Sequence, residues 1–145
     1  MPSENRSMYL LDASVAVRWF AKQPGYEAAE AWLVRYVDDS DLFVAPDLIR
    51  FEVCGALARL QQRGDKKWCK DSVDRFFSLG IHTLPTTTDL FNRAIDLARE
   101  IPMGSYDAIY LAHAEDLGIP WLTGDERALR RFDGDKHVHP MLRVD

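Results

Sequence analysis

The chain has 145 residues, which is the size of one ordinary domain. Hydrophobic residues make up 47% and charged residues 28% of it, a balance that is typical of globular proteins and excludes a disordered chain. The formal net charge is -5, so the molecule as a whole repels a phosphate backbone. This charge counts against tight nonspecific binding of nucleic acid, but it does not exclude contact with a few nucleotides through a local patch and a bound cation.

The cysteines and the apolar segments indicate where the protein works. Cys54 and Cys69 are the only cysteines, and we expect both to be reduced thiols within helices. No apolar run approaches the ~20 residues that a membrane span needs. Residues 1–7 are polar, lack the core of a signal peptide and are expected to form a flexible tail. We therefore expect a cytoplasmic protein that does not associate with membranes.

Short apolar segments alternate with amphipathic ones along the whole chain. We expect strands at 8–11, 42–44, 81–84, 119–122 and 136–139. We expect helices at 14–21, 26–37, 46–63, 65–79, 88–101, 105–117 and 126–132. In the helix 65–79 we expect Phe76 and Phe77 to face inward, and in the helix 88–101 we expect Phe91 on the buried face. This alternation predicts one α/β domain over 1–145, a three-layer sandwich in which a mostly parallel sheet of four to five strands is flanked by helices.

Two acids directly follow predicted strands. Asp12 comes after the first strand, and Asp125 comes after the fourth strand and Thr123-Gly124. In open parallel sheets, ligands bind at the carboxyl ends of the strands. The alternative is that each acid only caps the helix that follows it. Because parallel strands would place both acids at one edge of the sheet, their repetition favours a shared site.

Glu52 lies within the predicted helix 46–63. Its position is about 85° from the centre of the apolar stripe of that helix, on the rim of the buried face. A glutamate at such a boundary is common, so this position alone leaves a purely structural role open.

Asp107 shares a helix face with Tyr110, Leu111 and Ala114, and therefore points along a buried stripe. A buried carboxylate is costly unless it is paired or binds a metal ion. The alternative is that Ser105 caps the helix, which leaves Asp107 in the first turn, where the helix dipole favours an anion.

Four converging carboxylates would require protons or a cation. A site made only of oxygen ligands suits Mg²⁺ or Mn²⁺, which keep several bound waters. Zinc is less expected, because the sequence has no cysteine cluster and no HExxH motif. His137 and His139 form an HxH pair on a presumed edge strand, and we do not expect them to bind a metal ion.

Four segments of the sequence resemble the PIN-domain ribonucleases, and in particular the VapC-type toxins of toxin–antitoxin pairs. These segments are YLLDAS at 9–14, EVCGAL at 52–57, SYDAIYLAHA at 105–114 and WLTGD at 121–125. Their order and spacing agree with the family from about Tyr9 to His139. The chain departs from the family pattern at Ser14 and at Gly55, where family members often have Asn; the second departure loosens the expected support of the site.

The resemblance implies hydrolysis of RNA phosphodiester bonds by a metal-activated water. It implies that Asp12, Glu52 and Asp107 hold Mg²⁺ or Mn²⁺, and that Asp125 assists with that ion or with a second one. Ser14 and Thr123 would support these ligands by hydrogen bonds. The expected partners are the RNA substrate, a second copy of the chain in a homodimer, and a cognate antitoxin that covers the acidic site.

Basic residues gather in two places. Arg59, Arg63, Lys66, Lys67 and Lys70 form a first cluster, for which a solvated surface is the simpler interpretation. The second cluster, Arg127, Arg130 and Arg131, follows Asp125 directly. We expect Arg127 and Arg130 to bind RNA phosphates.

Two other functions fit an acidic α/β protein. One is a metal-dependent phosphatase, although the DxDx[TV] signature of one common class is absent after Asp12. The other is a noncatalytic protein-interaction module of the same fold. A nuclease of the same family outside any toxin–antitoxin pair is a variant of the main prediction. Exposed faces near Trp19, Phe20, Trp32, Trp68 and Phe76 are possible contact surfaces, although we expect most of these rings in the core.

Overall fold

A computed structural model describes residues 7–62, 68–100 and 104–145 of the chain. Nearly all of the predicted tail lies outside these ranges. Outside them also lie Arg63, Lys66 and Lys67 of the first basic cluster and the side chains of Trp68, Cys69 and Lys70.

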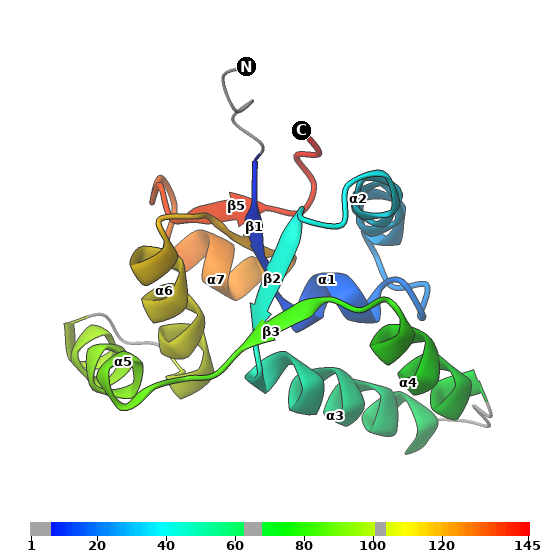
Figure 1. Cartoon of the computed structure of the whole chain (residues 1–145), viewed down its shortest axis with the longest axis horizontal. Helices are drawn as coiled ribbons and strands as arrows, with labels where there is room; N and C mark the ends of the chain where they lie inside the picture. Colours follow the sequence, from blue (N-terminus) through cyan, green and yellow to red (C-terminus); the bar gives the residue numbers. More distant parts are fainter. Residues whose placement is uncertain (1–6, 63–67, 101–103) are drawn as a thin grey trace.

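The described residues form one five-stranded sheet in which every neighbouring pair of strands is parallel (Figure 1). The strands are β1 (Tyr9–Leu11), β2 (Phe43–Pro46), β3 (His82–Leu84), β4 (Trp121–Thr123) and β5 (Val138–Pro140). Their order across the sheet is β3-β2-β1-β4-β5. The predicted parallel α/β sandwich is confirmed.

Helices cover both faces of the sheet. The first half of the chain supplies α1 (Ala13–Val17), α2 (Tyr26–Asp38), α3 (Leu48–Gln62) and α4 (Trp68–Ser78). The second half supplies α5 (Thr88–Glu100), α6 (Ser105–Leu117) and α7 (Glu126–Arg131). Buried residues of the first set form one core cluster, and those of the second set form another. The two clusters lie on opposite faces of the sheet, so the two sets of helices and the sheet between them form three layers.

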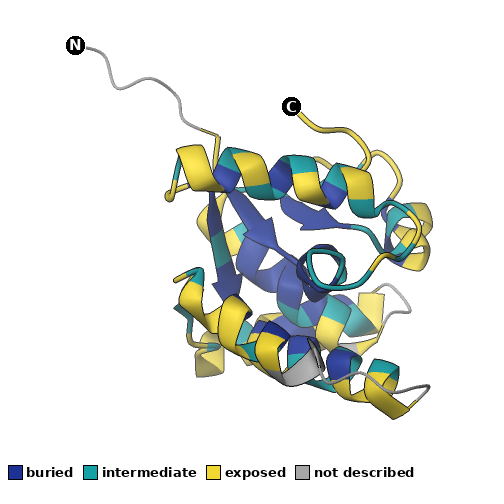
Figure 2. Cartoon of the chain, turned by 90° about the vertical axis from the view of Figure 1, so that its right-hand side faces the viewer, coloured by how far each residue is buried: buried dark blue, intermediate teal, exposed yellow. Residues whose placement is uncertain are grey.

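The strands separate these two cores. In β1, Tyr9 and Leu11 belong to the first core, whereas Leu10 belongs to the second. All three side chains are buried, as are nearly all of the central strands (Figure 2). A strand that is covered on both faces has no polar side to display, which explains the uninterrupted apolar runs in the sequence.

The chain reverses its direction of travel across the sheet between β1 and β4. It runs outward from β1 to β2 and β3, and then returns to place β4 beside β1. Leu11 pairs with Leu122 in this central ladder, so Asp12 and Thr123 follow at the same level. Such a reversal opens a crevice at the carboxyl edge of a parallel sheet. Two of the predicted site residues, Asp12 and Asp125, follow β1 and β4 at this edge.

The structure corrects several local expectations. Helix α1 ends at Val17 rather than near Ala21. Phe77 and Phe91, which we expected on buried faces, are 45% and 48% exposed. Phe77 directly follows Phe76, and Phe91 directly follows Leu90; Phe76 and Leu90 pack inward. Because successive helical side chains point about 100° apart, two adjacent residues cannot both face the core.

No helix within the described ranges has both the length and the apolar character that crossing a membrane demands.

Candidate functional site

Asp12 lies at the end of β1 and its side chain is only 7% exposed. It occupies the N-cap position of α1 but makes no side-chain capping bond. Instead, its Oδ2 accepts hydrogen bonds from Thr123 Oγ1 at 2.6 Å and Ser14 Oγ at 2.7 Å. The capping alternative therefore does not account for this carboxylate, whose hydrogen bonds come from Ser14 and Thr123 instead.

Ser14 and Thr123 hold Asp12 in place from two different elements. Ser14 Oγ also accepts a bond from Gly124 N at 2.8 Å, and Thr123 Oγ1 accepts one from Asp125 N at 3.1 Å. These bonds connect the start of α1 to the segment between β4 and α7. Both hydroxyls donate to Oδ2 of Asp12, and in the described part of the chain no donor reaches Oδ1. One oxygen is thus fixed while the other keeps its lone pairs.

Glu52 points from α3 toward α6, where Tyr110 Oη donates a hydrogen bond to its Oε1 at 2.7 Å. Tyr110 is buried and stacks on Trp121, with ring centroids 5.5 Å apart. Burial raises the pKa of Tyr110 well above 10, which keeps its hydroxyl a donor. Sequence reasoning placed Tyr110 in the core but missed this role; a tyrosine on a buried face needs a partner for its hydroxyl, and that requirement was the available signal.

Asp107 lies in the first turn of α6 and its side chain is 25% exposed. The N-cap of this helix is Gly104, not Ser105 as the structural alternative supposed, and it provides no side-chain bond. Arg131 Nη1 lies 3.6 Å from Asp107 Oδ2. The basic side chain that pairs with Asp107 is therefore Arg131. The sequence analysis placed Arg131 in the second basic cluster but did not predict this contact.

Asp125 does cap its helix. Its Oδ1 accepts a hydrogen bond from Arg127 N at 2.9 Å at the start of α7. The capping alternative is correct for this acid, and it occupies one of the two carboxylate oxygens. Arg127 and Arg130 themselves are exposed on α7.

The four acids share one electrostatic neighbourhood. The pKa of Asp12 is raised to about 6, chiefly by burial; the charges of Asp107 and Asp125 also raise it, and the hydrogen bonds from Thr123 and Ser14 lower it. Burial, together with the charge of Asp12, raises the pKa of Glu52 to about 7. Burial and Asp125 also raise the pKa of Asp107, and Arg131 opposes that shift. The predicted carboxylates are thus brought together from three helix starts and one helix interior.

The donor set of this site fits a hard divalent cation. All four candidate ligands are carboxylates, and their mutual repulsion is the condition that a bound cation relieves. Within the described ranges, no group of three His, Cys, Asp or Glu side chains is placed so that it could hold a metal ion by itself. Mg²⁺ keeps several of its own waters and needs few direct protein ligands, so an open acidic cluster suits it better than a closed cage.

One histidine of the HxH pair, His139, has hydrogen-bond partners in the C-terminal segment. His139 is buried, and both of its ring nitrogens lie within hydrogen-bond distance of Arg143, at 2.7 Å from its carbonyl and 2.9 Å from its guanidinium. This arrangement accounts for His139 as a structural residue near the C-terminus.

Comparisons with known proteins agree with the fold and the motifs. A crystal structure of PAE2754 from Pyrobaculum aerophilum matches with a TM-score of 0.71 and 20% identity, over 94% of this chain and 91% of that one. A toxin–antitoxin complex from Klebsiella pneumoniae matches with a TM-score of 0.66 and 18% identity, over 94% of this chain and 99% of the matched chain. Identities this low show the fold alone.

A search of curated proteins gives no match. A family model described as PIN domain, however, matches residues 9–135, which include all four acids. The resemblance seen in the sequence is confirmed: this chain belongs to the PIN domain family, whose members are generally nucleases and usually use divalent metal ions.

Proposed function

We propose that this protein is a Mg²⁺- or Mn²⁺-dependent endoribonuclease and the toxin of a type II toxin–antitoxin pair. The observation that carries the proposal is the buried carboxylate of Asp12 at the crevice, held through one oxygen by Ser14 and Thr123 and surrounded by three further acids. A charge so costly to bury is retained where it binds a ligand. Membership of a nuclease family supports the same activity.

The residues divide the work between them. Asp12, Glu52 and Asp107 would hold the cation directly or through water, and Asp125 would assist with that ion or with a second one. When bound, the cation would supply an activated water for attack on the phosphodiester and would neutralise charge that develops on the phosphate. Ser14 and Thr123 orient Asp12, and Tyr110 orients Glu52.

The proposal is tested by assaying the purified protein on single-stranded RNA and on a small phosphate monoester, each with Mg²⁺ and with excess chelator. Cleavage of internal RNA bonds that requires the cation supports the nuclease. Release of phosphate from the monoester without RNA cleavage would indicate the phosphatase, and inactivity on both substrates would indicate a noncatalytic module.

Tyr110→Phe is expected to lower RNA cleavage by about 10-fold or more, because Glu52 loses the hydroxyl that orients it. The half-saturating Mg²⁺ concentration should rise, since that hydrogen bond also lowers the pKa of Glu52. Both effects are read from a Mg²⁺ titration of the cleavage rate.

Tyr36→Phe is a matched control for this change. Tyr36 is also buried, and its hydroxyl donates to the backbone carbonyl of Leu79 at 2.6 Å. It belongs to the first core cluster, whereas Tyr110 belongs to the second, on the opposite face of the sheet. Both variants should lose roughly 1 kcal/mol of stability. If they reduced cleavage equally, Tyr110 would have only a structural role.

Replacing Arg127 and Arg130 by Ala is expected to weaken RNA binding and to reduce its dependence on salt. Each phosphate contact that is lost should make the negative slope of log K against log salt shallower by about 0.7 for a single strand. The slope is measured by titrating fluorescent RNA at several salt concentrations. An unchanged slope, equal to that of a control with the exposed Arg75 and Arg99 replaced, would remove both residues from the RNA-binding surface.

The match to a toxin–antitoxin complex supports an antitoxin partner for this chain. Of the aromatic residues considered as contact surfaces, Trp32 and Phe76 are buried in the core, and Trp19 and Phe20 are half-buried against it. Other apolar side chains do face solvent, among them Phe51 on α3 and Phe91 and Ile95 on α5. We propose these faces as the contact surfaces for the antitoxin and for a second copy of the chain.

Co-expression with the neighbouring open reading frame, followed by purification and light scattering, tests both partners. A stable complex that suppresses cleavage supports the toxin assignment. A strictly monomeric mass for the isolated chain at all concentrations would contradict the homodimer.

A further inference from the structure

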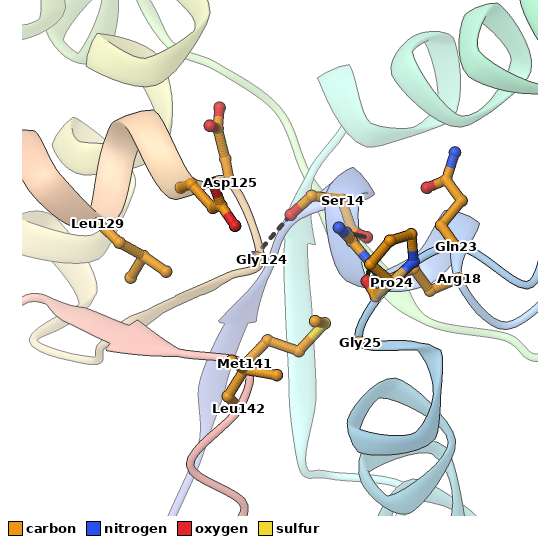
Figure 3. A pocket seen from close by; sticks show the side chains of 11 residues that line it. Ser14, Arg18, Gln23, Pro24, Gly25, Gly124, Asp125, Leu129, Met141 and Leu142 are labelled. Carbon is orange, nitrogen blue, oxygen red and sulfur yellow. Dashed lines mark hydrogen bonds between the residues drawn. The ribbon is translucent and has the colours of Figure 1, made fainter.

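A pocket of about 580 Å³ opens beside the acidic site, and no role has been assigned to it so far (Figure 3). Three parts of the chain line it: α1 together with the loop between α1 and α2, the segment from β4 into α7, and the residues after β5. Ser14 and Asp125 line it, so it is continuous with the carboxylate cluster. Its volume is within the ~300–1,000 Å³ of pockets that hold small organic groups.

The walls of the pocket are largely apolar. Leu129 of α7 and Met141 and Leu142 of the C-terminal segment face Pro24 across it (Figure 3). Gln23 supplies an amide at the rim. These walls suit a flat, mostly apolar group with a polar edge, because a thioether and aliphatic side chains contact ring faces well.

Two glycines allow the walls to approach one another. A Cβ on Gly124 would lie 2.9 Å from Arg18 Nη1 and 3.1 Å from Met141 Sδ, and a Cβ on Gly25 would lie 2.8 Å from Met141 Cε. Gly25 also has φ +88°, a conformation that other residues rarely adopt. Backbone atoms therefore form part of the pocket surface at these points.

Arg18 brings a positive charge to the floor of the pocket. Its Nε donates to the carbonyl of Pro24 at 2.8 Å and its Nη1 donates to the carbonyl of Ser14 at 2.6 Å. Within the described ranges it forms no ion pair, so a guanidinium edge remains available to an acceptor. Asp125 and Glu126 border the same pocket and would repel a phosphate group. A neutral ring with hydrogen-bond acceptors fits these charges better than an anion does.

We propose that this pocket holds one unstacked nucleobase of the RNA substrate, next to the phosphodiester that is cleaved, and thereby sets the base preference of the enzyme. The inference rests on the proposed ribonuclease function. Proteins that recognise single-stranded RNA commonly splay a base into a pocket, contact its faces and bind its edge. Here Met141 and Leu129 contact the faces, and Arg18 with Gln23 binds the edge.

The test compares cleavage by the wild-type protein and by pocket variants on single-stranded RNA of random sequence, with Mg²⁺. Sequencing of the products gives the base preference at every position around the cut. Leu129→Trp fills the pocket from α7, and Leu142→Trp fills it from the exposed rim, where folding is not at risk. Leu117→Trp, at an exposed position at the end of α6, is the matched control.

The wild type and Leu117→Trp should prefer a base at one position beside the cut by about tenfold or more, and the two pocket variants should lose that preference. The wild type should cleave an oligonucleotide that is abasic at this position about tenfold more slowly than the complete oligonucleotide. The pocket variants should cleave the two oligonucleotides at equal rates. A preference that survives both substitutions, or no preference in the wild type, overturns the inference while the ribonuclease stands. Absence of any Mg²⁺-dependent cleavage by the wild type overturns the proposed function as well.

Discussion

Asp12→Asn is expected to lower Mg²⁺-dependent RNA cleavage by about 10³-fold or more and, at the same time, to stabilise the metal-free protein. A ligand charge at a catalytic cation is worth several kcal/mol to the reaction. Asn keeps an oxygen that accepts the bonds from Ser14 and Thr123, so the local structure should persist. The substitution removes the charge and little else.

The stability gain follows from the burial of the same group. A pKa raised from 3.8 to about 6 corresponds to roughly 3 kcal/mol of unfavourable free energy at neutral pH, which Asn does not incur. Urea unfolding at pH 7.5 in chelator measures this gain. Asp107→Asn should abolish cleavage likewise, whereas Asp96→Asn, on the exposed face of α5, should change neither property. Full activity of Asp12→Asn would contradict the account.

The second large effect is a loss of stability as pH rises in the absence of a divalent cation. Asp12 and Glu52 ionise in the unfolded chain near their ordinary pKa values of 3.8 and 4.5, but in the folded protein only near 6 and 7. Between about pH 4 and pH 7 the folded state therefore binds more protons than the unfolded state. The contribution of these two groups to stability is most favourable below this window and becomes less favourable through it, by roughly 3 kcal/mol for Asp12 alone, with Glu52 acting in the same direction.

Saturating Mg²⁺ should restore much of the stability that is lost at pH 7.5, since a cation that binds only the folded state opposes its unfolding. The free energy of unfolding is measured at pH 5 and pH 7.5, with Mg²⁺ and with chelator. The cation should raise stability at pH 7.5 more than at pH 5, and Asp12→Asn should show a smaller difference. Equal stability at both pH values in chelator would mean that these carboxylates are not buried together.

The fold followed from the sequence because its strands and helices leave strong local signals. The apolar run before Asp12 and the one before Thr123 identified the two central strands, and the chain's alternation of strand and helix required a parallel sheet. Local signals were weaker inside helices. Two adjacent phenylalanines, Phe76 and Phe77, satisfied the same apolar pattern, but only Phe76 reaches the core.

The contacts of the site depend on tertiary structure and were less accessible. An acid that begins a helix looks the same in sequence whether it caps the helix, as Asp125 does, or accepts bonds from a neighbouring strand, as Asp12 does. The bond from Tyr110 to Glu52 joins residues 58 positions apart. Nothing in the local pattern of Arg18 indicates that its nearest neighbours include Gly124. Such pairings appear only once the chain is folded.

A crystal structure of the protein with Mn²⁺ tests the central claim most directly, because the anomalous signal of the ion locates it without reference to activity. We expect a Mn²⁺ ion whose ligands, direct or through one water, include the free oxygen of Asp12 and carboxylates of Glu52 and Asp107. An ordered crevice without Mn²⁺ at saturating concentration, together with RNA cleavage that persists in chelator, would contradict the claim.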